Sequence, residues 1–317
     1  MNISKKLETI QKTLGLTQTK LAGQLGVSFP TLNSWIIGKS IPRLKKEKII
    51  NDLFLEVTGQ KQIPEDELNK KRKILQYKTL GYKSVLREII DNPDIRDQFI
   101  LKLTYHSNGI EGSTLTEPDT ANILFNNIAI SEKTLMEHME AKNHQTALLY
   151  LFDYLLQKQK INEDLILKLH GILMNGIIPN AGVYRNHAVR IVGVNLPTSN
   201  YLSIKKNIQE LIRFSDDFLS KKDFNIISFS AIFHSKFEQI HPFSDGNGRI
   251  GRLLLNAFLL KDNMAPAVIR QEKKQLYYTY LYKSQIKEEY SQFEDYLCDA
   301  IMAGFTILER EDGEWYL

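Results

Sequence analysis

The clearest chemistry in this 317-residue sequence lies in one short run at 241–252, His-Pro-Phe-Ser-Asp-Gly-Asn-Gly-Arg-Ile-Gly-Arg. Gly246 and Gly248 free the main chain to expose successive N–H groups, and a glycine-rich turn that opens a helix binds anions. Arg249 and Arg252 lie three apart, so they face neighbouring positions on that helix and offer bidentate contacts to phosphate. His241 can accept a proton from a hydroxyl at neutral pH. We therefore predict a nucleotide-phosphate site with its own base.

Asp245 places an acid beside this cationic turn, as expected if a divalent cation bridges it to phosphate oxygens. The run has no Gly-Lys-Ser/Thr, which excludes a Walker A loop at this place. The alternatives are a metal site made by His241 and Asp245, or a purely structural loop. Two arginines beside a metal without phosphate are electrostatically unfavourable, so we favour the phosphate site.

The run follows the pattern His-Pro-Phe-x-Asp/Glu-Gly-Asn-Gly-Arg-x-x-Arg, and through it the chain resembles the Fic family over roughly residues 79–303. This resemblance implies an adenylyltransferase that moves AMP from ATP to a Ser, Thr or Tyr hydroxyl of a protein target, which can be the protein itself. By position in the motif, His241 would deprotonate the target hydroxyl and Asp245 would hold magnesium. Phe243 would anchor the loop in the core.

The resemblance also implies roles for the rest of the motif. Gly246, Asn247 and Gly248 would cradle the α- and β-phosphates, with Asn247 orienting the α-phosphate. Arg249 would help to neutralise the diphosphate leaving group, and Arg252 would bind the γ-phosphate. Kinase-like relatives of the Doc type carry Lys where this chain has Gly248, which favours the adenylyltransferase.

An upstream segment resembles the inhibitory motif Ser/Thr-x-x-x-Glu-Gly/Asn of some Fic proteins, with Ser107, Glu111 and Gly112 at the motif positions. We expect it in a helix near 104–112. Glu111 would pair with Arg252 in place of the γ-phosphate and leave ATP badly placed for attack. An ordinary helix end stopped by Gly112 is the alternative. In some relatives the same glutamate supports AMP removal, so Glu111 could switch between transfer and hydrolysis.

Residues 183–196 combine short β-type segments with Gly and Pro, which predicts a β-hairpin. This hairpin resembles the family's flap. Val189, Arg190 and Ile191 would line its edge and add a strand of the target by main-chain hydrogen bonds. Val189 is also assigned to the nucleotide pocket, and Tyr278 is the candidate for adenine contact.

The first 58 residues carry helix signals separated by Gly15, Gly26 and Gly38, with Thr17 and Ser28 as N-caps. Residues 16–42 resemble the lambda-repressor/Cro class of helix-turn-helix domains. The resemblance implies DNA binding, and a homodimer is common in that class. The candidate groove or phosphate contacts are Gln18, Ser28, Phe29, Thr31 and Asn33, with Lys39, Lys45 and Lys46 added for phosphate alone. A protein-docking or dimerisation module is the alternative.

The N-terminal part differs from the rest of the chain in net charge. Residues 1–60 hold nine Lys or Arg against four acidic residues, while the whole chain is only +4. This asymmetry suggests an acidic partner such as DNA for the N-terminal part. The single cysteine, Cys298, excludes an intramolecular disulfide framework, and no apolar run approaches the ~20 residues that span a bilayer. We expect a cytoplasmic protein that does not enter a membrane.

We therefore predict a mainly α protein with a helix-turn-helix domain and an all-helical Fic core that carries a β-hairpin flap. The expected divisions are a helix-turn-helix domain at 1–58, a linker at 59–78, the Fic domain at 79–303 and a C-terminal tail at 304–317. The leading function is an autoinhibited adenylyltransferase that uses ATP and Mg²⁺. The competing functions are a bifunctional enzyme that mainly removes AMP, and a DNA-binding regulator whose core senses nucleotide.

Overall fold

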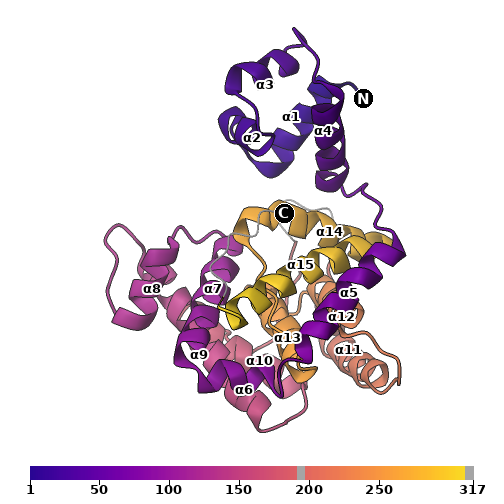
Figure 1. Ribbon diagram of the computed structural model, residues 1–317. Helices are drawn as coiled ribbons and strands as arrows, with labels where there is room; N and C mark the ends of the chain where they lie inside the picture. The colour runs from indigo at the N-terminus through magenta and orange to yellow at the C-terminus, as the bar shows by residue number, and fades with distance from the viewer. Residues whose placement is uncertain (191–196, 311–317) are drawn as a thin grey trace.

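The computed structural model describes residues 1–190 and 197–310, and these residues form helices and loops without a strand (Figure 1). The α-helices are α1 Ile3–Leu14, α2 Gln18–Gln24, α3 Phe29–Ile36, α4 Leu44–Val57, α5 Glu65–Thr79, α6 Val85–Asp91, α7 Pro93–Glu111, α8 Glu117–Asn126, α9 Leu135–Leu156, α10 Glu163–Leu173, α11 Ile204–Leu219, α12 Ile226–Ile240, α13 Asn247–Lys261, α14 Lys274–Lys287 and α15 Ser291–Leu308. Short 3₁₀ turns, η1 Tyr201–Ser203 and η2 Gln271–Lys273, precede α11 and α14. In the described residues, no helix combines the length and apolar character that crossing a bilayer requires.

Helices α1–α4 form a small bundle with its own apolar centre, which includes Leu7, Leu21, Leu32 and Ile50. Side-chain caps begin α1, α2 and α3, as where Thr17 Oγ1 accepts a hydrogen bond from the Lys20 amide at 3.3 Å. The segment between α2 and α3 turns through Gly26, whose φ of 60° suits glycine. Short polar helices of this kind depend on mutual packing for their stability.

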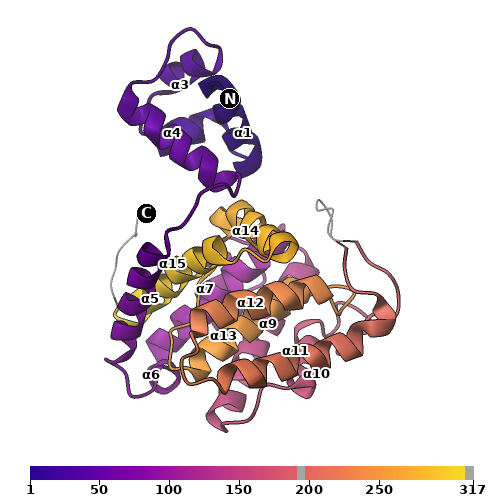
Figure 2. The same cartoon turned by 90° about the vertical axis from the view of Figure 1, so that its right-hand side faces the viewer.

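The bundle packs against α14 and projects from the larger helical core (Figure 2). Helix α4 packs against α14, and the chain then leaves the bundle through Gly59. The Gly59 carbonyl accepts hydrogen bonds from Lys283 Nζ and Gln292 Nε2, each at 3.0 Å. The exit from the bundle is therefore tied to α14 and α15 rather than left free.

The predicted linker over 59–78 contains helix α5, which packs along α15. Its polar sequence hides a narrow apolar stripe, since Leu68 and Leu75 are fully buried. Lys71 Nζ lies 2.7 Å from carboxylate oxygens of both Asp295 and Asp299 on α15. The acidic residues of α15 therefore neutralise part of the positive charge that suggested a solvated linker. At the other end of the chain, α15 runs to Leu308, past the expected boundary at 304, because Phe305 and Leu308 are buried.

The centre of the core is the pair α12 and α13, which make the most extensive helix contact in the described residues. Helix α13 is buried along nearly its whole length, and its sequence is apolar on every side apart from Asn and Arg residues. Helices α7, α9, α10, α11, α14 and α15 surround the pair (Figure 2). The loop 241–246, which joins α12 to α13, is thereby held from both sides.

The described part of the predicted hairpin, residues 183–190, contains no strand. Residues 191–196, including Ile191, lie outside the described residues. The hairpin therefore stays a prediction.

Replacing Leu75 tests whether α5 belongs to the core. Because Leu75 is fully buried against α15, Leu75→Ala is expected to lower the free energy of unfolding by about 2–5 kcal/mol. The neighbouring Ile74 is 51% exposed, so Ile74→Ala is expected to change it by about 0.5 kcal/mol or less. Urea unfolding of the full chain measures both values. Equal and small effects would mean that this segment is a linker.

Candidate active site

The loop between α12 and α13 is closed by Asn247 and Phe243. The Asn247 amide accepts a hydrogen bond from the Phe243 N–H at 2.8 Å and donates one to the Phe243 carbonyl at 2.9 Å. The buried Phe243 ring stacks on His170 with centroids 3.7 Å apart, which is the anchoring role expected for Phe243. Gly246 opens α13 with a φ of 78°, and a Cβ there would lie 2.8 Å from Met174 Sδ. The loop therefore has one tightly specified conformation.

His241 ends α12 with a left-handed main chain, φ 50°. Its Nδ1 lies 3.3 Å from the Glu238 carbonyl, to which it donates in the tautomer that leaves the Nε2 lone pair available. Burial lowers the pKa of His241 and nearby Arg185 lowers it further, against the opposite effects of the Glu238 carbonyl, Glu111 and Asp245. The imidazole is therefore neutral near pH 7, as a proton acceptor must be.

Arg249 extends from the first turn of α13 and is almost completely buried. Its Nη1 lies 2.7 Å from Glu140 Oε1 on α9, and its Nη2 lies 3.5 Å from Asp245 Oδ1. The Asp245 side chain is 59% exposed, and its Oδ1 accepts a 2.6 Å hydrogen bond from the Gly246 N–H. The loop thus presents one accessible carboxylate beside a fixed guanidinium.

Arg252 follows one turn later and is held from α7. Its Nε donates to Ser107 Oγ at 3.0 Å and its Nη2 donates to the Ser107 carbonyl at 3.0 Å. The same Nη2 lies 2.7 Å from Glu111 Oε1, while Nη1 is buried without a hydrogen-bond partner. Burial by itself lowers the pKa of Arg252, but Glu111 outweighs it and the pKa is raised. The charge of Arg252 is therefore permanent.

Glu111 is the last residue of α7, and Gly112 ends the helix with a φ of 112°. The Glu111 side chain is 33% exposed, so solvent reaches the carboxylate that Arg252 binds. A methyl group on Gly248 would collide with Glu111 Oε1. Gly248 is thus needed for the close approach of Glu111 to the N-terminus of α13, and the structure brings Ser107, Glu111 and Gly112 to the motif loop.

Tyr278 on α14 reaches the end of α7, where its hydroxyl donates to the Ile110 carbonyl at 3.4 Å. Tyr277 lies behind it, with its ring centroid 6.0 Å from the Arg252 guanidinium carbon. Gln285, also on α14, donates to the Ser235 carbonyl at 3.3 Å. Of the flap residues, Val189 accepts a 3.0 Å hydrogen bond from Thr198 Oγ1 through its carbonyl, and Arg190 is exposed. Ile191 is not among the described residues.

Glu238 is a functional candidate that the sequence analysis missed. It is 6% exposed, and its Oε1 has no hydrogen-bond partner. Burial raises the pKa of Glu238 to about 8, with Arg252 opposing and Glu111 reinforcing the rise. Helical spacing from the buried His234 could have signalled it, because an acid four residues further on lies on the same apolar face.

Two buried histidines support the site instead of acting in it. His170 accepts a 2.8 Å hydrogen bond from the Gly182 N–H at Nδ1 and donates from Nε2 to the Asp245 carbonyl at 3.1 Å. His234 Nε2 lies 2.7 Å from the Tyr277 hydroxyl. Burial lowers the pKa of His170 to about 4 and that of His234 to about 3, so both are neutral at pH 7.

Of the candidate DNA contacts in the N-terminal bundle, Gln18 begins α2 and the others lie on α3 or cap it. Ser28, Phe29 and Thr31 are exposed, while Gln18 and Asn33 are half-buried. Ser28 Oγ also caps α3, because it accepts from the Thr31 N–H at 3.4 Å. Lys46 differs from the expected phosphate contact: its Nζ donates to the Leu25 carbonyl at 2.6 Å and so stabilises the turn before α3.

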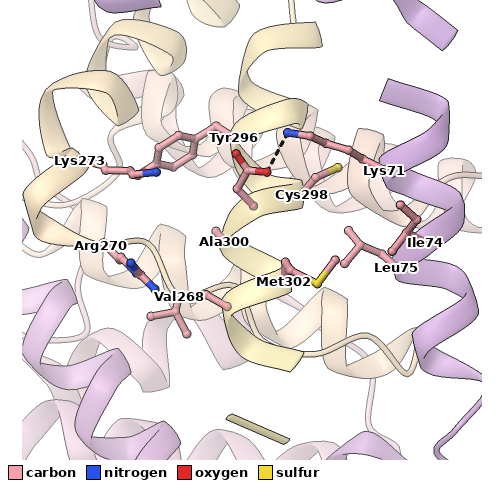
Figure 3. A pocket seen from close by; sticks show the side chains of 12 residues that line it. Lys71, Ile74, Leu75, Val268, Arg270, Lys273, Tyr296, Cys298, Ala300 and Met302 are labelled. Carbon is pink, nitrogen blue, oxygen red and sulfur yellow. Dashed lines mark hydrogen bonds and ion pairs between the residues drawn. The ribbon is translucent and has the colours of Figure 1, made fainter. Parts of the chain in front are cut away.

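A separate cavity of about 230 Å³ lies between α5 and α15 (Figure 3). Its walls include Ile74, Leu75 and Met302, and Arg270 and Lys273 extend toward it from the loop before α14. None of the candidate site residues lines this cavity. The chemistry of the motif loop therefore does not depend on it.

The pH dependence of stability tests the buried state of Glu238. Folding raises the pKa of this carboxyl from 4.5 to about 8, so the folded chain binds the extra proton between these values. The free energy of unfolding should therefore fall as pH rises from 5 to 8, and Glu238→Gln should reduce that fall. Urea unfolding at both pH values measures it, with the exposed Glu210→Gln as control. An unchanged fall in Glu238→Gln would show that Glu238 is ionised throughout.

Comparison with known proteins shows which family the segment around the motif loop resembles. Residues 160–259, which contain the motif loop, match the Fic/DOC family. The chain is 36% identical over 182 residues to the protein adenylyltransferase Fic of Nematostella vectensis, covering 56% of this chain and 41% of that protein. It is 33% identical over 181 residues to the same-named protein of Drosophila willistoni, covering 56% and 35%. The chain thus spans less than half the length of these relatives.

Solved structures agree in fold. Fic-1 of C. elegans superposes with a TM-score of 0.67 at 21% identity, covering 98% of this chain and 87% of that one. A Fic-domain signalling protein of Bacteroides thetaiotaomicron gives 0.64 at 22% identity, covering 78% and 99%. The helical core around α12 and α13 therefore has the fold of these Fic-domain structures.

Proposed function

We propose that this protein is an adenylyltransferase that transfers AMP from ATP to a Ser, Thr or Tyr hydroxyl of a protein, and that Glu111 restrains it. One observation carries the proposal. Two buried arginines lie in the first two turns of α13, whose glycine-rich start follows the loop that begins at the neutral His241. Buried guanidinium groups need anionic partners, and phosphate suits their geometry.

The triphosphate would bind along the start of α13. The main chain at Gly246, Asn247 and Gly248 lies where a helix N-terminus attracts anions. Because the Asn247 amide bonds both polar groups of Phe243, we infer that Asn247 orients the α-phosphate mainly by shaping the loop. Arg249 would stabilise the diphosphate leaving group, and Arg252 would contact the γ-phosphate. This preorganised charge would favour the transition state over the ground state.

The transfer step needs one base. The target hydroxyl oxygen would attack the α-phosphorus of ATP as its proton passes to His241 Nε2. The bond from the α-phosphorus to the bridging oxygen then breaks, and pyrophosphate leaves. Tyr278 and Val189 are proposed to contact the adenine. Val189, Arg190 and Ile191 are proposed to align the target segment by main-chain hydrogen bonds.

The donor set fits Mg²⁺ carried in with the nucleotide. The described residues contain no group of three or more His, Cys, Asp or Glu that could hold a metal ion by itself. Mg²⁺ is usually bound by one or two carboxylates together with substrate phosphates, and Asp245 offers one exposed carboxylate beside the phosphate site. The ion would neutralise phosphate charge, while His170 and the Gly246 N–H keep Asp245 in place.

The restraint by Glu111 rests on the 2.7 Å contact with Arg252. Ser107 orients the guanidinium with two hydrogen bonds, so that it meets the Glu111 carboxylate directly. A γ-phosphate that sought Arg252 would encounter this carboxylate and its negative charge. Removing Glu111 would free Arg252 for the nucleotide and leave the loop and His241 unchanged.

Transfer of label from α-labelled ATP with Mg²⁺ tests base and restraint together. Wild type is expected to label itself or lysate proteins weakly, and Glu111→Gly strongly. Glu111→Gly/His241→Ala should lose the signal, since a general base contributes typically ~10²–10⁴-fold. Filter-binding of ATP to each variant is the control. If Glu111→Gly binds ATP but does not transfer label, the proposal fails.

Removal of AMP is the second candidate, because Glu111 lies close enough to His241 to favour its protonated form. Proteins labelled by Glu111→Gly, purified and then mixed with wild type, distinguish the two directions. Retention of label supports net transfer. Loss of label that requires Glu111 would make AMP removal the main activity.

We also propose that the N-terminal bundle is a helix-turn-helix domain that binds DNA, as a homodimer on two half-sites. The exposed Ser28, Phe29 and Thr31 at the start of α3 and the basic charge of residues 1–60 support this proposal. A regulator whose core only senses nucleotide would keep this binding without any AMP transfer. His241→Ala would then retain nucleotide-dependent binding of DNA.

Salt dependence measures the phosphate contacts of Lys39 and Lys45, which are both exposed. Replacing both by Gln is expected to weaken duplex binding and to reduce the slope of log affinity against log salt by about two. Fluorescence anisotropy of the full chain measures both, with Lys205→Gln/Lys206→Gln on α11 as control. An unchanged slope would indicate a protein-docking module instead.

A further inference from the structure

Arg185 is a buried arginine, 2% exposed, whose side chain binds only main-chain carbonyls. Its Nε donates to the His241 carbonyl at 2.7 Å, and Nη1 donates to His187 at 2.7 Å. Nη2 donates to Ser199 at 2.6 Å and to Ile240 at 3.4 Å. The Arg185 N–H adds a 3.0 Å bond to the Pro242 carbonyl. One residue thus bonds both ends of segment 186–199 and the start of the motif loop.

These contacts hold His241 in a conformation that it would rarely adopt alone. His241 has a φ of 50°, and non-glycine residues in this region persist when surrounding contacts impose it. Arg185 binds the carbonyls of Ile240 and His241 and, through its own N–H, that of Pro242. The direction of the imidazole therefore depends on the planar fork of this guanidinium.

The charge of Arg185 is not compensated locally. In residues 1–190 and 197–310, no carboxylate lies within ion-pair distance of its guanidinium. The groups that act on His241 are the Glu238 carbonyl on α12, Glu111 at the end of α7 and Asp245 in the loop, which all favour the imidazolium. Burial and Arg185 favour the neutral ring.

We infer that Arg185 is a positioning residue for the AMP transfer proposed above: its guanidinium aligns His241 with the flap ends, and its positive charge keeps the imidazole neutral. The inference rests on the proposed function for its catalytic consequence. The effect of Arg185 on the charge of His241 does not depend on that function. The two roles can be tested separately, because lysine keeps the positive charge but lacks the planar guanidinium, and glutamine lacks the charge.

Titration of the histidines by NMR tests the electrostatic part without any activity. Burial lowers the pKa of His106, His144 and His234 to about 3 and that of His170 to about 4, so their signals should stay constant above roughly pH 5. The remaining signals are those of His138, His187 and His241, and His241→Ala assigns the last. Arg185→Gln should raise the pKa of His241, while Arg185→Lys should leave it unchanged.

Activity tests the positioning part in the Glu111→Gly background. Both Arg185→Lys and Arg185→Gln should reduce kcat roughly ten- to a hundred-fold, because either change loosens the base. KM for ATP should change little, since the side-chain hydrogen bonds of Arg185 in the described residues go to the carbonyls of His187, Ser199, Ile240 and His241, away from the proposed phosphate contacts. Only Arg185→Gln should move the acid limb of the pH–rate profile upward. Arg213→Gln on α11, an exposed arginine, should change none of these values.

The outcomes distinguish the inference from the proposed function. Equal His241 titration in Arg185→Gln and wild type, or equal shifts in both Arg185 variants, would overturn the electrostatic role. Unchanged kcat in Arg185→Lys would overturn the positioning role. If Arg185→Gln does not fold, Arg185→Lys still tests the inference, since it must lower kcat at an unchanged pKa of His241. If Glu111→Gly transfers no label at all, the proposed function fails while the titration result still stands.

Discussion

The guanidinium of Arg252 carries a charge that it cannot lose, in a position that water hardly reaches. Such a group needs an anion or several oxygen atoms close to it, and removing them would leave a buried charge uncompensated. Ser107 supplies two oxygen contacts and Glu111 supplies the anion. The end of α7 and the start of α13 are therefore bound to each other by one residue. The same requirement underlies the proposal that Arg252 contacts phosphate once the carboxylate moves away.

The rest of the core supports this contact by fixing the conformation of the loop before α13. Phe243 and Asn247 lock the loop before α13, and His170 holds both the Phe243 ring and the Asp245 carbonyl. Gly248 and Gly251 leave room where Glu111 and Glu238 approach α13, since a Cβ at either position would collide with a carboxylate oxygen. These close approaches explain why two carboxyl groups and two arginines fit around one helix turn. Burial raises the pKa of Glu238 to about 8, so that this carboxyl is largely protonated at pH 7.

Helix α14 joins the two parts of the chain. Its Tyr277 and Tyr278 lie beside Arg252 and the end of α7, while the helix also contacts α4 and Gly59 at the exit from the N-terminal bundle. The expected linker did not reveal this connection, because its charged sequence resembles a solvated segment. The neutralising acids of α15 lie more than two hundred residues further along the chain, and local composition cannot indicate them.

The sequence by itself indicated the glycine-rich loop before α13 and the N-caps of α2 and α3. These depend on local chemistry: glycines that open a helix, caps such as Thr17 and Ser28, and a proline after His241. It also indicated Glu111 as a partner of Arg252, through a resemblance and not through geometry. Only the tertiary structure decided that Glu238 is buried beside Arg252, that Asn247 bonds Phe243 within the loop, and that Arg185 grips the main chain of His241. These features depend on burial and on contacts between distant segments, and the pKa and conformation of a side chain are set by that surrounding rather than by its neighbours in sequence.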